Sequence, residues 1–118
     1  MTLLTNTIIT IIAIQHIAFL VLEMFYWDKA LGRRVFGHSK EIAKVSKTLA
    51  ANQGLYNGFL AAGLFWGLTL GADGMNVTTF FLACVLIAGI FGGMTASHKI
   101  LYIQALPALI GLILIFLL

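Results

Sequence analysis

Four long apolar stretches alternate with short polar connections along the chain, at residues 3–27, 48–70, 77–94 and 100–118. Each is close to the roughly 20 residues that a helix needs to cross about 30 Å of hydrocarbon. A membrane barrel strand would instead alternate apolar and polar residues over about ten positions. The pattern predicts an all-α polytopic membrane protein. We expect a four-transmembrane-helix bundle, formed as a single domain over residues 1–118.

The composition agrees with a lipid environment. Hydrophobic residues make up 61% of the chain and charged residues 9%, whereas about a quarter of the residues of a soluble domain are charged. The first apolar stretch has no basic segment before it and ends in Glu23, Trp27 and Asp28 rather than in small residues. We therefore expect a retained helix and not a cleaved signal peptide.

The positive charges indicate a topology. Every lysine and arginine falls in the first or the third connection: Lys29, Arg33, Arg34, Lys40, Lys44, Lys47 and Lys99. The second connection, residues 71–76, carries Asp73 and no basic residue. The positive-inside rule then places the first and third connections in the cytoplasm and both termini outside. Because topology explains the net charge of +3, we expect no nucleic acid partner.

Small residues mark the second stretch as a packing helix. In lipid, such residues allow the backbones of two helices to approach closely. They form two rows with a spacing of four: Gly54, Gly58 and Ala62, then Gly63, Gly67 and Gly71. Their partners lie either in the same chain or in a second copy, which would make a homo-oligomer through Gly-rich faces.

Two local signals refine the helix ends. Ser39 is a suitable N-cap, so the second helix is expected to begin before its apolar part. The lysines of this extension, Lys40, Lys44 and Lys47, share a face that fits anionic lipid headgroups, or is simply solvated. Pro107 should kink the last helix because it removes a backbone hydrogen bond.

Polar side chains collect in the cytoplasmic half of the spans and near the midplane. They are His16, Glu23, Asn52, Gln53, Tyr56, Asn57, Tyr102 and Gln104. An ionisable group inside a span is costly, so its presence calls for a reason. The pattern predicts a polar pocket open to the cytoplasmic leaflet. The alternative for each residue is a hydrogen bond between helices.

The sequence leaves three functions open. The first is an enzyme or binding protein for a small amphipathic molecule, in which Glu23 acts as acid, base or counter-ion and the amides orient the ligand. The second is a small proton-coupled multidrug-type exporter, and the third is a structural or assembly subunit. The chain has no nucleotide motif and no cluster of metal-ligand residues, so we expect neither a cofactor nor a metal.

Three segments resemble an uncharacterised bacterial membrane family, domain of unknown function 1304 (DUF1304): FLVLEMFYW from Phe19, NQGLYNGFLAAGL from Asn52 and ILYIQALPALIGL from Ile100. This resemblance implies four spans in the bacterial inner membrane and no particular activity. A fainter similarity is to the MAPEG superfamily of four-helix membrane enzymes. Asn52 and Tyr56 match the Asn and Tyr of its glutathione motif, while Thr48 and Leu55 replace its Arg and Glu, so only the architecture is carried over.

Overall fold

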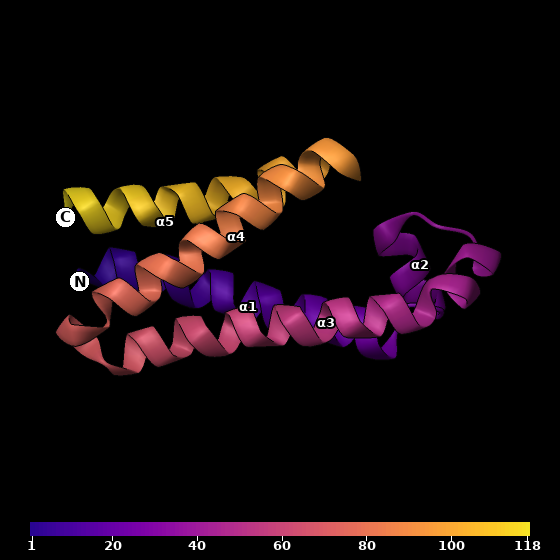
Figure 1. Ribbon diagram of the computed structural model, residues 1–118, viewed down its shortest axis with the longest axis horizontal. Helices are drawn as coiled ribbons and strands as arrows, with labels where there is room; N and C mark the ends of the chain where they lie inside the picture. The colour runs from indigo at the N-terminus through magenta and orange to yellow at the C-terminus, as the bar shows by residue number, and fades with distance from the viewer. The chain divides into compact units, whose positions relative to one another are not determined.

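The computed structural model describes residues 1–118 and is built of helices alone, which confirms the all-α prediction (Figure 1). In chain order the elements are α1 (Leu3–Phe25), α2 (Ala30–Phe36), α3 (Lys40–Thr69), the 3₁₀ turn η1 (Gly71–Gly74), α4 (Met75–Thr95), the π-helical turn η2 (Leu101–Ala105) and α5 (Leu106–Leu117). The four apolar stretches correspond to α1, the later part of α3, α4, and η2 with α5.

Two helical segments are long and apolar enough to cross a membrane, Leu3–Phe25 and Gly71–Thr95. The segment Leu101–Leu117 is apolar but shorter. Helix α3 has the length, but the charged residues in its first two turns and its three amides, Asn52, Gln53 and Asn57, make it less apolar than the other two.

The chain forms two compact units. Residues 14–61 make one, called here the hairpin unit, and residues 1–13 with 62–118 make the other, the terminal unit. Helices α1 and α3 contribute to both units, so the expectation of a single domain over residues 1–118 stays a prediction.

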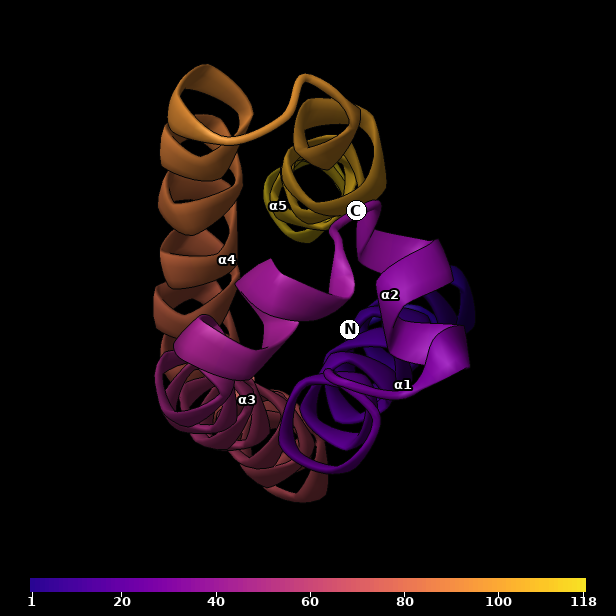
Figure 2. The same cartoon turned by 90° about the vertical axis from the view of Figure 1, so that its right-hand side faces the viewer.

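In the terminal unit, α4 lies beside η2 and α5 (Figures 1 and 2). The approach is close because Gly89 faces Ala105, and a Cβ at Gly89 would lie 2.7 Å from the Ala105 backbone nitrogen. Both chain termini and η1 lie at one end of this unit, and the connection after Thr95 lies at the other end (Figure 1). The fully buried core includes Ile9, Leu64, Leu82, Val85 and Ala108.

The backbone widens just before Pro107. Residues Leu101–Ala105 are π-helical, and the Leu106 N–H bonds to the carbonyl of Leu101, five residues earlier. Proline has no N–H and its ring crowds the carbonyl four residues before it, so an α-helical register cannot continue unchanged through this point. The expected kink stays a prediction, but the irregularity lies where proline was expected to produce one.

In the hairpin unit, α2 was not predicted from the sequence. Its end is set by Gly37, which has the left-handed φ of 71° and donates its N–H to the Arg33 carbonyl at 2.8 Å. Gly32 sits against the backbone carbonyl of Tyr26, where a Cβ would not fit. The next helix begins at Lys40, and Ser39 Oγ accepts the Ile42 N–H at 3.3 Å. The predicted N-cap and the early start of this helix are therefore confirmed.

Candidate functional site

The central feature of the hairpin unit is a buried hydrogen bond between α1 and α3. The amide Nδ2 of Asn57 donates to Oε1 of Glu23 at 2.5 Å. The Glu23 side chain is 8% exposed and that of Asn57 6%. No lysine or arginine pairs with Glu23, since the ion pair of the chain joins Lys47 to Asp28. The Glu23 carboxyl group is thus buried, and its hydrogen-bond partner is a neutral amide.

Two glycines of α3 allow this contact. A Cβ at Gly54 would lie 2.7 Å from Met24 Cγ and 3.1 Å from Glu23 Cβ, and a Cβ at Gly58 would lie 2.6 Å from Leu20 Cδ1. The first small-residue row therefore packs at Gly54 and Gly58 against α1 of the same chain.

The second small-residue row also packs against another helix of the same chain. Gly63 contacts the Phe81 ring and Gly67 contacts Thr78, both on α4 in the terminal unit. Gly71 instead ends the row in a turn with a φ of 63°. Both rows of α3 thus find partners in the same chain, at the residues named.

His16 is completely buried in the hairpin unit, two turns before Glu23 on α1. Its ring meets Phe19 edge to face, with 5.4 Å between ring centroids. Among the polar residues predicted for the site, His16, Glu23 and Asn57 are the buried ones of this unit.

The other three polar residues predicted on α3 are at the surface. Asn52 and Gln53 are exposed and hydrogen-bond to no other group of the chain. Tyr56 is 58% exposed, with its ring 6.0 Å from that of Phe59. The structure therefore joins Asn57 to Glu23 and leaves Asn52, Gln53 and Tyr56 facing outward.

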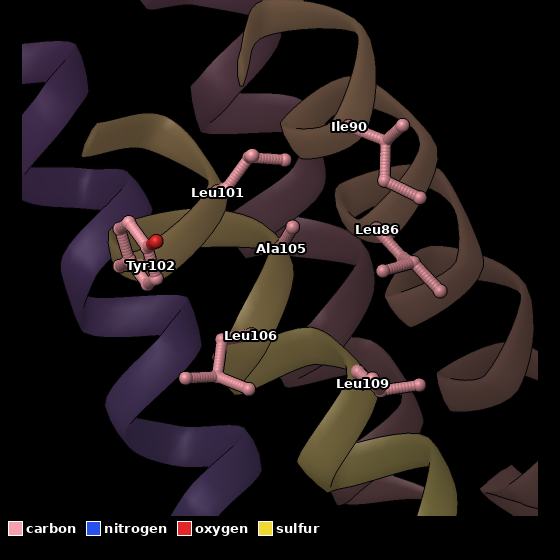
Figure 3. Close-up of a pocket in the computed structure, with 7 residues that line it drawn as sticks. All are labelled: Leu86, Ile90, Leu101, Tyr102, Ala105, Leu106 and Leu109. Carbon is pink, nitrogen blue, oxygen red and sulfur yellow. The ribbon is translucent and has the colours of Figure 1, made fainter. Parts of the chain in front are cut away.

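Tyr102 and Gln104 belong to the terminal unit. Gln104 Nε2 donates to the Val85 carbonyl at 3.3 Å, an interhelical bond of the kind considered as the alternative to a ligand site. Tyr102 is 71% exposed and borders an open groove of about 250 Å³ between α4 and the η2–α5 segment (Figure 3). The groove is apolar, with the Tyr102 hydroxyl as the polar group among its lining residues: Leu86, Ile90, Leu101, Tyr102, Ala105, Leu106 and Leu109.

A second polar cluster of the hairpin unit was missed by sequence reasoning. Trp27 Nε1 donates to Ser46 Oγ at 3.0 Å, and its ring lies 4.1 Å from the His38 ring, centroid to centroid. His38 Nε2 lies 3.1 Å from the Trp27 carbonyl, which can only accept, so Nε2 carries the proton. These contacts link residues far apart in the chain, so no local sequence pattern predicts them.

Beside this cluster, Lys47 Nζ lies 3.1 Å from Asp28 Oδ2. The hydrogen bond from Lys47 lowers the pKa of the Asp28 carboxyl below its ordinary value. The pair stabilises the connection after α1 only modestly, since both side chains are partly in solvent.

The fold and this site define a class: an all-α protein with two helices able to cross a membrane and a buried carboxyl–amide pair between α1 and α3. The chain belongs to the family described as Protein of unknown function (DUF1304), whose model matches residues 10–116. This confirms the resemblance seen in the three sequence segments. It is 29% identical over 115 residues to the uncharacterized protein YpaA of Lactococcus lactis subsp. lactis (strain IL1403), covering 96% of this chain and 97% of that protein. No solved structure matches the chain. The similarity to the MAPEG superfamily stays a prediction.

Proposed function

We propose that this chain crosses a membrane four times, with both termini outside and the basic connections in the cytoplasm. The lengths of Leu3–Phe25 and Gly71–Thr95 support two of the crossings directly. Within the terminal unit, Asp73 and both termini lie at one end, while Lys99 lies in the connection at the other end (Figure 1). This separation agrees with the positive-inside rule.

The proposed activity is the binding of a small amphipathic molecule with a positively charged headgroup, at Glu23. The observation that carries it is a carboxyl group 8% exposed, with one neutral amide donor and no lysine or arginine beside it. An ionised carboxylate in a low-dielectric environment is costly unless a cation compensates it. Because the chain supplies no such side chain, a ligand cation is the natural partner.

The proposed binding geometry follows from the position of Glu23 in the last turn of α1, which ends at Phe25. In the proposed topology this end faces the cytoplasm. A headgroup entering from the cytoplasmic leaflet would need to pass only the final turn, while its apolar part remained in the lipid. Asn57 would hold one carboxyl oxygen and leave the other for the ligand.

Binding of tritiated tetraphenylphosphonium, a lipophilic cation, to the full chain in lipid nanodiscs tests this proposal. We expect Glu23→Gln to weaken binding about tenfold or more, because it removes a charge-assisted contact of roughly 1.5–3 kcal/mol. Glu41→Gln is the matched control, since Glu41 is exposed at the start of α3. Equal binding by wild type and Glu23→Gln would contradict the proposal.

A second candidate function rests on the same observation. A proton can neutralise the Glu23 carboxyl as well as an organic cation can, which is the requirement for a proton-coupled exporter. Proteoliposomes with an imposed pH gradient distinguish the two. Movement of tetraphenylphosphonium driven by the gradient, and lost in Glu23→Gln, would favour the exporter. Binding without such movement would favour the binding protein.

A further inference from the structure

An exposed row of side chains runs along α3 in the hairpin unit at alternating spacings of three and four. Its members, named here the α3 seam, are Ile42, Val45, Leu49, Asn52, Tyr56 and Phe59. All six are exposed, and the five apolar or aromatic members are between 55% and 83% exposed. Helix α1 presents a similar exposed row, at Leu4, Ile11, Ile14, Val21 and Phe25, which lipid can cover in the proposed four-span arrangement. The α3 seam differs from that row because it contains an exposed amide.

The spacing is that of a heptad seam, in which two helices meet along positions three and four residues apart. The contacts of α3 within the chain use a different side of the helix, formed by buried residues: Ala43, Ala50, Gly54, Asn57 and Ala61. Helix α3 therefore packs within the chain along one face, and the α3 seam on another face is left uncovered.

Asn52 lies in the middle of the α3 seam and identifies the partner. Its amide hydrogen-bonds to no group of the chain, and lipid tails offer neither donor nor acceptor. An amide is both donor and acceptor, so it is complementary to a second copy of itself. In lipid, an asparagine amide that bonds to its counterpart on a facing helix stabilises the contact between the two helices.

We propose that the α3 seam packs against the same seam of a second copy of this chain, with Asn52 bonded to the partner's Asn52. Copies inserted in the same direction are related by a two-fold axis along the membrane normal, which makes the two α3 helices parallel. The inference rests on the proposed four-span arrangement and does not depend on a ligand at Glu23.

The charges of α3 agree with this arrangement. Lys40, Lys44 and Lys47 occupy heptad positions away from the α3 seam, so like charges do not meet at the axis. Thr48 and Gln53 flank the seam at the two positions that face each other in a parallel pair. The Thr48 hydroxyl then lies opposite the amide of Gln53 of the partner subunit.

Disulfide cross-linking in native membranes tests the seam. In a Cys84→Ser background, single cysteines are placed at Val45, Leu49, Asn52 and Tyr56, and at the off-seam positions Lys40, Lys44 and Ala51. We expect covalent dimers to form at least fivefold more at the four seam positions than at the three others. Equal cross-linking at all seven positions, or none at the seam, would overturn the inference.

The affinity of the pair tests the role of Asn52 without new cysteines. Fluorescence energy transfer between labelled copies in liposomes should show association weakened about tenfold for Asn52→Leu, the effect expected for one lost interhelical amide bond. Ile17→Ala, on an exposed face of α1, is the control and should leave association unchanged. Glu23→Gln should associate like wild type, so a failed ligand proposal and a failed seam proposal give different results. Unchanged association of Asn52→Leu would contradict the seam.

Discussion

Asn57 and Glu23, 34 residues apart in the chain, are joined by a hydrogen bond from Nδ2 to Oε1, and both side chains are buried. Removing one partner of such a pair costs more than removing both, because the remaining group stays buried without a partner.

We therefore expect Asn57→Leu to lower the free energy of unfolding by about 1–3 kcal/mol. The double variant Glu23→Leu with Asn57→Leu should recover most of this loss, since two apolar side chains then meet. Unfolding in mixed micelles by increasing dodecyl sulfate measures both. Asn76→Leu, at an exposed amide of α4, is the control and should change little. A double variant less stable than Asn57→Leu would contradict this account.

Two glycines of α4 should respond differently to alanine. A Cβ at Gly89 would lie 2.7 Å from a backbone nitrogen of Ala105, whereas a Cβ at Gly92 would lie 3.2 Å from the side-chain Cγ2 of Ile100. Backbone cannot move aside as a side chain can, so Gly89→Ala should cost about 1–3 kcal/mol.

For Gly92→Ala, mild crowding is opposed by the higher helix propensity of alanine, worth about 1 kcal/mol. We expect a stability within about 1 kcal/mol of wild type, measured by the same unfolding experiment. A Gly92→Ala variant less stable than Gly89→Ala would show that α4 and the η2–α5 segment do not pack as described.

The end of α2 depends on the backbone conformation of Gly37. Its φ is 71° and no atom would crowd a Cβ there, so a substitution acts through conformation alone. Gly37→Ala should destabilise the hairpin unit by about 1–2 kcal/mol, and Gly37→Asn by less, because asparagine tolerates the left-handed region. In a Trp66→Phe background, the fluorescence of Trp27, whose ring packs on Phe36 and His38, reports the change during unfolding. Equal effects of alanine and asparagine would contradict the conformational explanation.

The ion pair of Asp28 predicts a small pH dependence. Lys47 lowers the pKa of the Asp28 carboxyl, so the unfolded chain binds this proton more readily than the folded chain. The contribution to stability is therefore present above the ordinary aspartate pKa of about 3.9 and is lost as the pH falls through the lower pKa of the folded state.

Carbon-13 NMR of the carboxyl group should place the Asp28 midpoint below the ordinary value in wild type, and Lys47→Met should return it toward that value. High salt should reduce the difference, since the pair is partly exposed. A midpoint that Lys47→Met leaves unchanged would contradict the assignment. Asp73→Asn, at an exposed aspartate in η1, controls for the loss of one acidic charge.

The sequence by itself determined the positions of the long helices and the start of α3. Hydropathy and capping depend on residues close together in the chain, so the apolar stretches and Ser39 were sufficient. The small-residue rows also identified the faces of α3 that pack, although not which helices they meet. Helix α2 was missed because its seven residues lack an apolar period and its end depends on the left-handed turn at Gly37.

Only the tertiary structure decided which amide of α3 holds Glu23. Asn52, Gln53 and Asn57 are equivalent candidates in the sequence, but Asn57 shares a helix face with Gly54 and Gly58, where α1 approaches. Asn52 is turned away from that face and is exposed. A hydrogen bond across 34 residues depends on the rotation of one helix against another, and that rotation is fixed by packing at the glycines rather than by any local pattern.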